Sequence, residues 1–293
     1  MCRFGIPGIF QKEIKVKFSD DIITARANPT VKWAAALKDK KGRDREGAFI
    51  AEGEKLTFEA LSAHLPVTHI FVAESKRDKI VPRILELSSG KEYENCRLLC
   101  VADGVFEKIS TENAPQGVIS VIKHLDFFKQ SAIIYKEEFS QNAIGRCIAM
   151  CSVRDPGNLG SAIRSAVAFG VEHIILSSDC ADIYNPKTVR GAMGSLFRVK
   201  VTRVSSLEKF IEAMHFNGRR VFAAELTERA LPLGDSPMTA YDAVIIGNEG
   251  HGIPASISEI CDGSVYIPIS NKTESLNASV AAAIFMWEQS KLS

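Results

Sequence analysis

One stretch in the middle of the chain limits the fold more than any other. Residues 147–151 form an apolar run with the length and composition of a buried strand. Residues 161–169 have the composition of a short helix, which Gly170 would end. Between them lies a tight Pro-Gly-Asn turn. A strand followed by a turn and a helix is the unit of an open α/β sheet, in which ligands bind where the strands end.

Two polar side chains of this stretch are the first candidate site residues. Asn158 lies in the expected turn, and Arg164 lies about one turn inside the expected helix. The run is otherwise poor in charge, so we expect both side chains to face one crevice. A Pro-Gly turn before a helix is common, and a single helical arginine is usually solvated, so further motifs are needed to indicate a site.

The composition excludes several classes of protein. The chain has 293 residues, 46% hydrophobic and 24% charged, which is typical of a globular protein with one large or two ordinary domains. Its formal net charge is +1, so only local clusters of cations could bind nucleic acid. The apolar runs are too short to span a membrane. Seven cysteines without a Cys-x-x-Cys pair predict reduced, buried thiols in a cytoplasmic protein, and no metal site.

Strand-like and helix-like segments alternate in two parts of the chain, which predicts two α/β domains. Residues 1–27 form no clear element and are interpreted as an arm. Residues 28–123 alternate strands with helices but hold no cluster typical of catalysis, so we expect a binding role. Residues 124–142 mix aromatic and charged residues and are interpreted as a linker. Residues 143–293 form the second domain.

Two basic segments are candidate phosphate contacts. Residues 38–46 hold five cations and three acids, although a solvated helix end would have the same composition. The candidates there are Lys41, Arg43 and Arg45. Residues 183–206 hold five cations and no acid, which favours phosphate contact over a chance cluster. The candidates there are Lys187 and Arg190.

Two further strand ends carry unusual polar residues. The strand at residues 243–246 runs into a loop with three glycines in six residues, whose exposed backbone groups suit an anion or the edge of a heterocycle. Glu249 is the carboxylate of this loop. A final helix is expected to begin at Glu274, with Ser275 and Asn277 in its first turn. Ser275 could be an N-cap, whereas Asn277 is harder to explain because asparagine is a poor helix former.

Taken together, these three stretches resemble the SpoU/TrmH branch of the SPOUT RNA methyltransferases. The matching motifs, in order, are Asn158-x-Gly160-x-x-x-Arg164, then Gly247-Asn248-Glu249-Gly250-x-Gly252, then Ile267-Pro268 followed by Ser275-Leu276-Asn277-x-Ser279-x-Ala281. Upstream, Asn28-Pro29, Lys41-Gly42-Arg43 and Phe49-Ile50-Ala51-Glu52-Gly53 are similar to the substrate-binding domain common in that family. The resemblance covers nearly all of the chain after residue 25.

The resemblance implies a fold, a cofactor and a reaction. The first domain would be a ribosomal-protein-like α/β RNA-binding domain. The second would be an α/β SPOUT methyltransferase domain threaded into a trefoil knot, which general folding rules would not propose. S-adenosyl-L-methionine would bind in the knot, and a homodimer would have active sites at its interface. The reaction would be methylation of a ribose 2′-hydroxyl, in large-subunit rRNA or, as the alternative, in tRNA.

The family's site residues carry over to this sequence position by position. The implied cofactor contacts are Gly247, Asn248, Gly250, Ile267 and Leu276. The implied catalytic residues are Arg164, Asn158, Glu249, Ser275 and Asn277. We interpret Arg164 as a fixed cation that clamps the adjacent phosphate and stabilises the developing alkoxide, because a guanidinium hardly ever deprotonates in proteins. Asn158, Ser275 and Asn277 would orient ribose and cofactor, and Glu249 would anchor Arg164 or the loop.

Two other classes of protein stay open at this point. A catalytically silent RNA-binding protein of the same fold would not need the polar residues Asn158, Arg164, Glu249 and Asn277. A nucleotide-dependent α/β enzyme acting on a small molecule would need neither a separate N-terminal domain nor the acid-free basic segment. Binding of S-adenosylmethionine would separate the first of these from an active enzyme.

Overall fold

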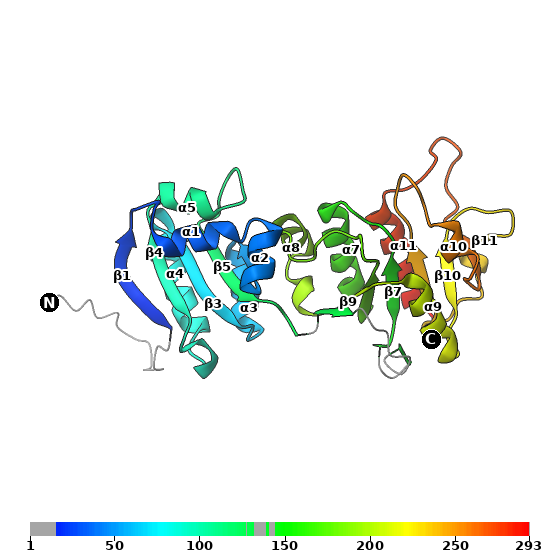
Figure 1. The fold of residues 1–293 in the computed structure, drawn as a ribbon, viewed down its shortest axis with the longest axis horizontal. Coiled ribbons are helices and arrows are strands. Elements are labelled where there is room, and N and C mark those ends of the chain that lie inside the picture. The colour runs from blue at the N-terminus through cyan, green and yellow to red at the C-terminus, as the bar shows by residue number, and fades with distance from the viewer. Residues whose placement is uncertain (1–15, 127, 132–138, 141–143, 293) are drawn as a thin grey trace. The chain divides into compact units, whose positions relative to one another are not determined.

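The computed structural model describes residues 16–126, 128–131, 139–140 and 144–292. The chain divides into two compact units, Met1–His124 and Leu125–Ser293, and each contains one sheet with helices packed against it (Figure 1). The predicted α/β class is therefore confirmed. Among the described residues, no helix is both long enough and apolar enough to cross a membrane.

The first unit is built on a mixed five-stranded sheet with the order β1-β4-β3-β5-β2. Its elements are β1 (Lys17–Ile23), α1 (Pro29–Ala36), α2 (Lys40–Glu46), β2 (Ala48–Glu52), α3 (Glu54–Ser62), β3 (Val67–Ala73), α4 (Arg77–Leu87), β4 (Arg97–Val101), α5 (Asp103–Ile109) and β5 (Val118–Lys123). Strands β1, β4 and β3 are parallel neighbours, and β5 runs antiparallel to β3 and β2. Buried side chains of α1 and α5 pack on one face of this sheet.

The second unit is built on an eight-stranded sheet with the order β11-β13-β10-β12-β7-β8-β9-β6, in which every neighbouring pair is parallel. Its strands are β6 (Phe128–Ser131), β7 (Cys147–Met150), β8 (His173–Leu176), β9 (Lys200–Val204), β10 (Val221–Ala224), β11 (Leu231–Pro232), β12 (Ala243–Ile246) and β13 (Gly263–Tyr266). Its helices are α7 (Pro156–Ala168), α8 (Pro186–Ala192), α9 (Leu207–Phe216), α10 (Ala255–Ser258) and α11 (Ala278–Ser290).

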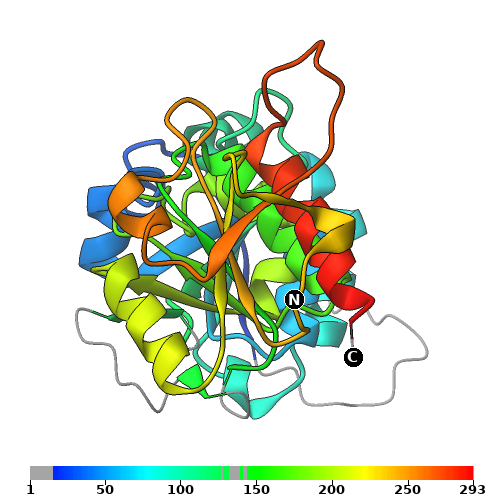
Figure 2. The same cartoon turned by 90° about the vertical axis from the view of Figure 1, so that its right-hand side faces the viewer.

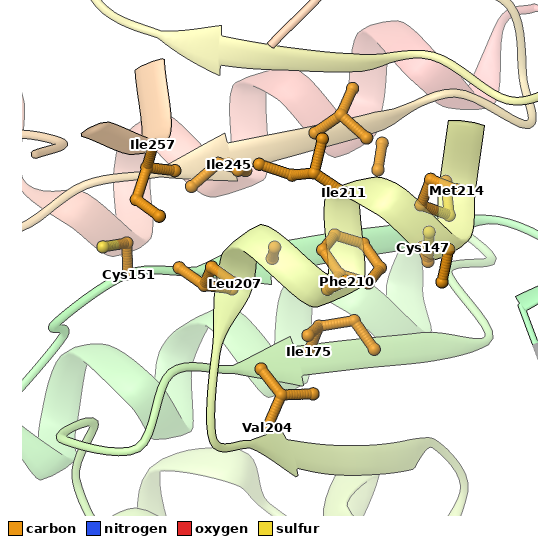
Figure 3. Close-up of a cluster of buried hydrophobic side chains, with 14 of the residues drawn as sticks. Cys147, Cys151, Ile175, Val204, Leu207, Phe210, Ile211, Met214, Ile245 and Ile257 are labelled. Carbon is orange, nitrogen blue, oxygen red and sulfur yellow. The ribbon is translucent and has the colours of Figure 1, made fainter. Parts of the chain in front are cut away.

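Helices cover both faces of this parallel sheet, as its apolar strands require. In Figure 2 the sheet lies between α9 and α10 on one side and α11 on the other. A cluster of buried apolar side chains fills the space under α9 (Figure 3). It includes Leu207, Phe210 and Met214 from the helix and Cys147, Ile175 and Ile245 from β7, β8 and β12. Burial raises the pKa of the Cys147 thiol to about 11, so this cysteine belongs to the apolar core.

Two strands lie where the sequence predicted an arm and a linker. Strand β1 pairs with β4, and most of its side chains are exposed because it is an edge strand. An edge strand with polar residues on both faces gives no alternating pattern, so the prediction of no element before residue 28 was wrong. Strand β6 pairs with β9 at the other sheet's edge. The remaining residues of the predicted arm and linker include 1–15, 132–138 and 141–143, which lie outside the described residues.

Helix α7 begins earlier than the sequence predicted. Asp155 is its N-cap and accepts a hydrogen bond from the Asn158 backbone N–H at 2.8 Å, and Pro156 occupies the first helical position. Proline is favoured there because its missing N–H would have no helical partner. Asn158 therefore lies in the first turn of the helix. The Pro-Gly-Asn segment, which was expected to form a turn before a helix starting at residue 161, is itself part of the helix.

The contact between α7 and α8 requires glycine at position 160. A Cβ atom there would lie 2.6 Å from the Thr188 carbonyl oxygen and 3.0 Å from the Gly191 Cα. Both neighbours are backbone atoms, which cannot move aside as a flexible side chain would. This close approach sets how α7, with Asn158 at its start, is held on the sheet.

We therefore expect Gly160→Ala to lower the free energy of unfolding by about 1–3 kcal/mol through overpacking. The matched control is Gly234→Ala in the same unit, where a Cβ meets nothing within 4 Å, so the change should stay within about 0.5 kcal/mol. Urea unfolding of both variants measures the difference. Equal stabilities would contradict the close packing of these two helices.

Candidate functional site at three strand ends

Three loops of the second unit meet at one edge of the sheet. Strands β7 and β12 are direct neighbours, and β10 separates β12 from β13. Because all of these strands are parallel, the segments that follow them leave from the same edge. Asn158 follows β7, Glu249 follows β12, and Asn277 follows β13.

These three residues form one hydrogen-bonded group, here called the Asn–Glu–Asn cluster. The Asn158 Nδ2 group donates to Glu249 Oε1 at 2.5 Å, and the Asn277 Nδ2 group donates to Asn158 Oδ1 at 2.9 Å. Glu249 Oε1 also accepts from the Ala278 backbone N–H at 3.3 Å. The cluster joins side chains that are 91 and 119 positions apart in sequence.

Asn277 has a second role as the N-cap of α11. Its Oδ1 atom accepts from the Ser279 and Val280 backbone N–H groups at 2.9 and 3.4 Å. The oxygen is thereby used by the helix, and the amide nitrogen is left to donate to Asn158. The expected start of this helix at Glu274, with Ser275 as a candidate cap, was wrong: Ser275 lies in the loop before it, exposed, and its carbonyl accepts from Thr273 Oγ1 at 3.2 Å.

A cavity of about 450 Å³ opens beside the cluster. Its lining includes Gly247, Asn248, Ile267 and Leu276, four of the five predicted cofactor contacts, together with Glu249 and Ser275. The fifth, Gly250, does not line it, but its N–H donates to Asn248 Oδ1 at 2.9 Å and so holds the loop. The lining carries the carboxylates of Glu225, Glu249 and Glu274 and no lysine or arginine.

Gly247 lets the loop fold back on itself at the cavity wall. A Cβ atom at this position would lie 2.5 Å from the Gly252 carbonyl carbon, and Asn248 and Gly252 exchange backbone hydrogen bonds of 3.2 and 2.8 Å. The Asn248 side chain ties the loop to the end of β7, since its Nδ2 group donates to the Ser152 carbonyl at 3.0 Å. Glycine at position 247 is thus required by the tight closure of this loop.

Arg164 does not join this cluster. It is exposed on α7, and within the described residues its guanidinium has no ion pair or hydrogen bond. Six helical positions separate Arg164 from Asn158, which places them about 120° apart around the axis. The expectation that both face one crevice was therefore wrong. Glu249, which was expected to anchor Arg164 or the loop, accepts hydrogen bonds from Asn158 and from the start of α11.

Asp155 contacts the cluster through Asn158 and was not singled out in the sequence analysis. It caps α7 through Asn158, and its Oδ2 atom accepts from Lys187 Nζ at 2.9 Å. The Lys187 and Asn158 hydrogen bonds lower the pKa of this carboxyl below its ordinary value. An Asp-Pro pair at the start of a helix was the available signal, because aspartate is a preferred N-cap and proline a preferred first residue.

The predicted RNA contacts fall into different environments. Arg43 is 2% exposed and donates to the Leu37 and Lys38 carbonyls at 3.0 and 2.6 Å, so it closes the end of α1 and is not a surface contact. Lys41 is exposed, and Arg45 is exposed and paired with Glu46 at 2.7 Å. In the second unit Lys187 is paired with Asp155, and Arg190 is exposed on α8.

Comparisons with known proteins agree with this geometry. Residues 145–287 match the SpoU rRNA Methylase family, and residues 28–120 match the MRM3-like substrate binding domain. The chain is 31% identical over 265 residues to the 23S rRNA (guanosine(2553)-2′-O)-methyltransferase RlmP of Bacillus subtilis, across 90% of this chain and 97% of that protein. It is 28% identical over 271 residues to the 23S rRNA (uridine(2479)-2′-O)-methyltransferase of Streptomyces viridochromogenes, across 91% and 90%. An AdoMet-bound rRNA methyltransferase from Sinorhizobium meliloti has a TM-score of 0.76 at 27% identity, across 94% and 98%.

The double role of Asn277 predicts different effects for two substitutions. Asn277→Ala removes the helix cap and should lower the free energy of unfolding by about 0.5–2 kcal/mol. Asn277→Ser keeps a capping oxygen but loses the amide donor to Asn158, so stability should change by only a few tenths of a kcal/mol. Urea unfolding compares the two. If both variants lost the same stability, the cap would not be the source of the effect.

Proposed function

The chain belongs to the SpoU rRNA methylase family, and from this premise we propose that it methylates a ribose 2′-hydroxyl of large-subunit rRNA with S-adenosyl-L-methionine as methyl donor. The observation that supports this most directly is the Asn–Glu–Asn cluster beside a 450 Å³ cavity at the sheet edge. Two related proteins named as 23S rRNA 2′-O-methyltransferases favour rRNA over tRNA as substrate.

The cavity fits this cofactor in its chemistry. Three carboxylates and no cations line it, which suits a ligand that carries a positive sulfonium and an ammonium group. Ile246, Ile267 and Leu276 supply apolar walls for a purine ring, and Gly247 leaves backbone groups accessible. These residues would hold the cofactor, which when bound supplies an electrophilic methyl group on a sulfonium that leaves as a neutral thioether.

The protein's own residues must orient the ribose and manage the charge on its oxygen. The 2′-hydroxyl is a weak acid that loses its proton as the new O–C bond forms. Glu249 accepts from the amide of Asn158, and the first turn of α11 donates to the amide oxygen of Asn277. The orientation of both amides is thereby fixed, which positions them to hold a sugar hydroxyl. Ser275, in the cavity wall, adds an exposed hydroxyl. Arg164 would stabilise the developing alkoxide and clamp the adjacent phosphate as a permanent cation.

We propose that Arg164 serves the site of a second copy in a homodimer. Helix α7 packs against α11, and the outer side of α11 carries two exposed apolar side chains, Val280 (47% exposed) and Trp287 (49%), two helical turns apart. A partner that covers this side would remove both from water. Arg164 is exposed and lies outside its own chain's Asn–Glu–Asn cluster, so it is accessible to such a partner.

The first unit would bind the RNA. Residues 28–123 hold the part that matches a substrate-binding domain, and Lys41 and Arg45 lie exposed on it. In the second unit Lys187 and Arg190 would add phosphate contacts. An enzyme that acts on ribosomal RNA would work in the cytoplasm.

The direct test is transfer of labelled methyl groups from S-adenosylmethionine to an unmodified 23S rRNA transcript, with a tRNA transcript beside it. We expect label in the ribose of the 23S transcript. Arg164→Ala should lose on the order of hundredfold in turnover while still binding cofactor, because one stabilising charge is removed. Arg164→Lys keeps the charge but loses the planar fork, so near-normal turnover would contradict the clamp. Absence of cofactor binding in calorimetry would contradict the reaction itself.

The dimer predicts that Trp287→Glu yields monomers, because a buried carboxylate at an interface is costly. Sedimentation velocity measures the association. As a control, Leu226→Glu changes a more exposed apolar residue that is not on α11 (76% exposed) and should leave association unchanged. Mixed dimers of Arg164→Ala and Glu249→Gln chains should regain methyl transfer, since one of their two sites is intact. Activity that stays absent in the mixture would contradict sharing of the site between copies.

A further inference from the structure

A second, smaller cavity lies next to the one assigned to the cofactor. It measures about 190 Å³ and is lined by Ser152, Arg154, Asn248, His251, Gly252 and Pro254. Asn248 and Gly252 line both cavities, so the two share a wall. One ordered water needs only about 10–15 Å³, so this space is far larger than a water site. Of its lining residues only Asn248 was predicted as a cofactor contact, and only Asn248 and Gly252 belong to the family motifs.

Ser152 holds an unusual backbone conformation at the base of this cavity. Its φ angle is +57°, in the left-handed region that side chains other than glycine seldom adopt. The surrounding residues fix it: its N–H donates to Ser177 Oγ at 2.9 Å, and its carbonyl accepts from Asn248 Nδ2 at 3.0 Å. Such strain costs on the order of 1–3 kcal/mol and is concentrated at binding and catalytic positions. Here it turns the chain so that Arg154 follows into the cavity wall.

Arg154 is a fixed cation with spare hydrogen-bond donors. Its Nη2 group donates to Asp179 Oδ2 at 2.8 Å, while its side chain remains 69% exposed. Asp179 is itself held by Ser177 and Ser152, which donate to it at 2.7 and 2.8 Å. Burial alone would raise the pKa of Asp179, but the hydrogen bonds from Ser177, Arg154 and Ser152 outweigh it and lower the pKa to about 2. The carboxylate thus stays ionised and orients a guanidinium whose other N–H groups are accessible.

The opposite wall offers ring surfaces. The backbone N–H of His251 donates to Asn248 Oδ1 at 3.3 Å, which fixes the residue in the loop, and its side chain is exposed. Pro254 adds a second ring nearby in the lining. Flat aromatic and apolar surfaces stack on nucleobases, and an arginine is a common phosphate contact. The cavity therefore combines the two kinds of contact that a single nucleotide makes.

We propose that this small cavity binds a nucleotide of the substrate RNA next to the acceptor, with its phosphate on Arg154 and its base against His251. The assignment rests on the proposed methyl transfer: the shared wall places this nucleotide beside the cavity for the methyl donor, while the acceptor ribose lies at the Asn–Glu–Asn cluster. An exposed arginine–aspartate pair adds only about 0–1 kcal/mol of stability. The strained backbone at Ser152 and the three groups that donate to Asp179 thus position Arg154 and add little to the stability of the fold.

The test measures how tightly an unmodified 23S rRNA transcript binds at several salt concentrations. Arg154→Ala should weaken binding on the order of tenfold and reduce the slope of log affinity against log salt by about one, because one phosphate contact is lost. Lys209→Ala removes the same charge from the exposed side of α9 and should change neither quantity by more than about twofold. The dissociation constant of S-adenosylmethionine, from calorimetry, should be unchanged in both variants.

Two further variants separate contact from positioning. Asp179→Asn keeps the Arg154 charge but loosens its orientation, so affinity should fall with no change in salt slope. His251→Ala should also weaken binding with an unchanged slope, since no charge is lost. Arg154→Lys should restore the slope and part of the affinity.

Unchanged RNA affinity and slope in Arg154→Ala would overturn the inference, as would an equal loss of cofactor affinity. These results are distinct from failure of the proposed reaction. If the wild-type protein binds the transcript but transfers no methyl group, the reaction is wrong, and the binding series still decides whether Arg154 contacts RNA.

Discussion

The rest of the site depends on the hydrogen bonds that the Glu249 carboxylate accepts. One of its oxygens accepts hydrogen bonds from the side chain of Asn158 and from the backbone of Ala278, so it joins the helix after β7 to the helix after β13. Neither helix follows β12 directly, whereas Glu249 lies in the loop after that strand. The parallel order of β7, β12, β10 and β13 makes this possible, because it brings the ends of all these strands to one edge.

Most of the fold could be predicted from the sequence, and the errors have physical causes. The buried strands β7 and β12 are short, fully apolar runs, and β8 differs only by the histidine at its start, so their residues indicate them directly. Strand β1 carries the polar residues of an exposed edge and gives no such pattern. The start of α7 was placed too late because its cap, Asp155, precedes a Pro-Gly pair that is typical of a turn. The start of α11 was placed too early because Ser275 could also serve as a cap, whereas the cap is Asn277.

The sequence predicted the residues of the cluster but not the directions in which side chains point. Motifs identified Asn158, Glu249 and Asn277, which the structure brings together, but a motif does not say where a side chain points. Arg164 is on the same helix as Asn158 but is exposed and outside the cluster, and Arg43 is in a basic run yet is buried and donates to two carbonyls. The Arg154–Asp179 pair could not be found this way, because it depends on a strained serine and on residues from two separate loops.

Asn277 links the geometry of the Asn–Glu–Asn cluster to the integrity of a single helical turn. The atom that caps α11 and the atom that positions Asn158 belong to the same amide, so fraying at the start of this helix also releases the neighbouring side chains. Helix ends open far more often than whole domains unfold. We therefore expect heating to abolish activity by local melting at the start of α11 while the sheets remain folded. A partner that covers α11 would raise the temperature at which activity is lost.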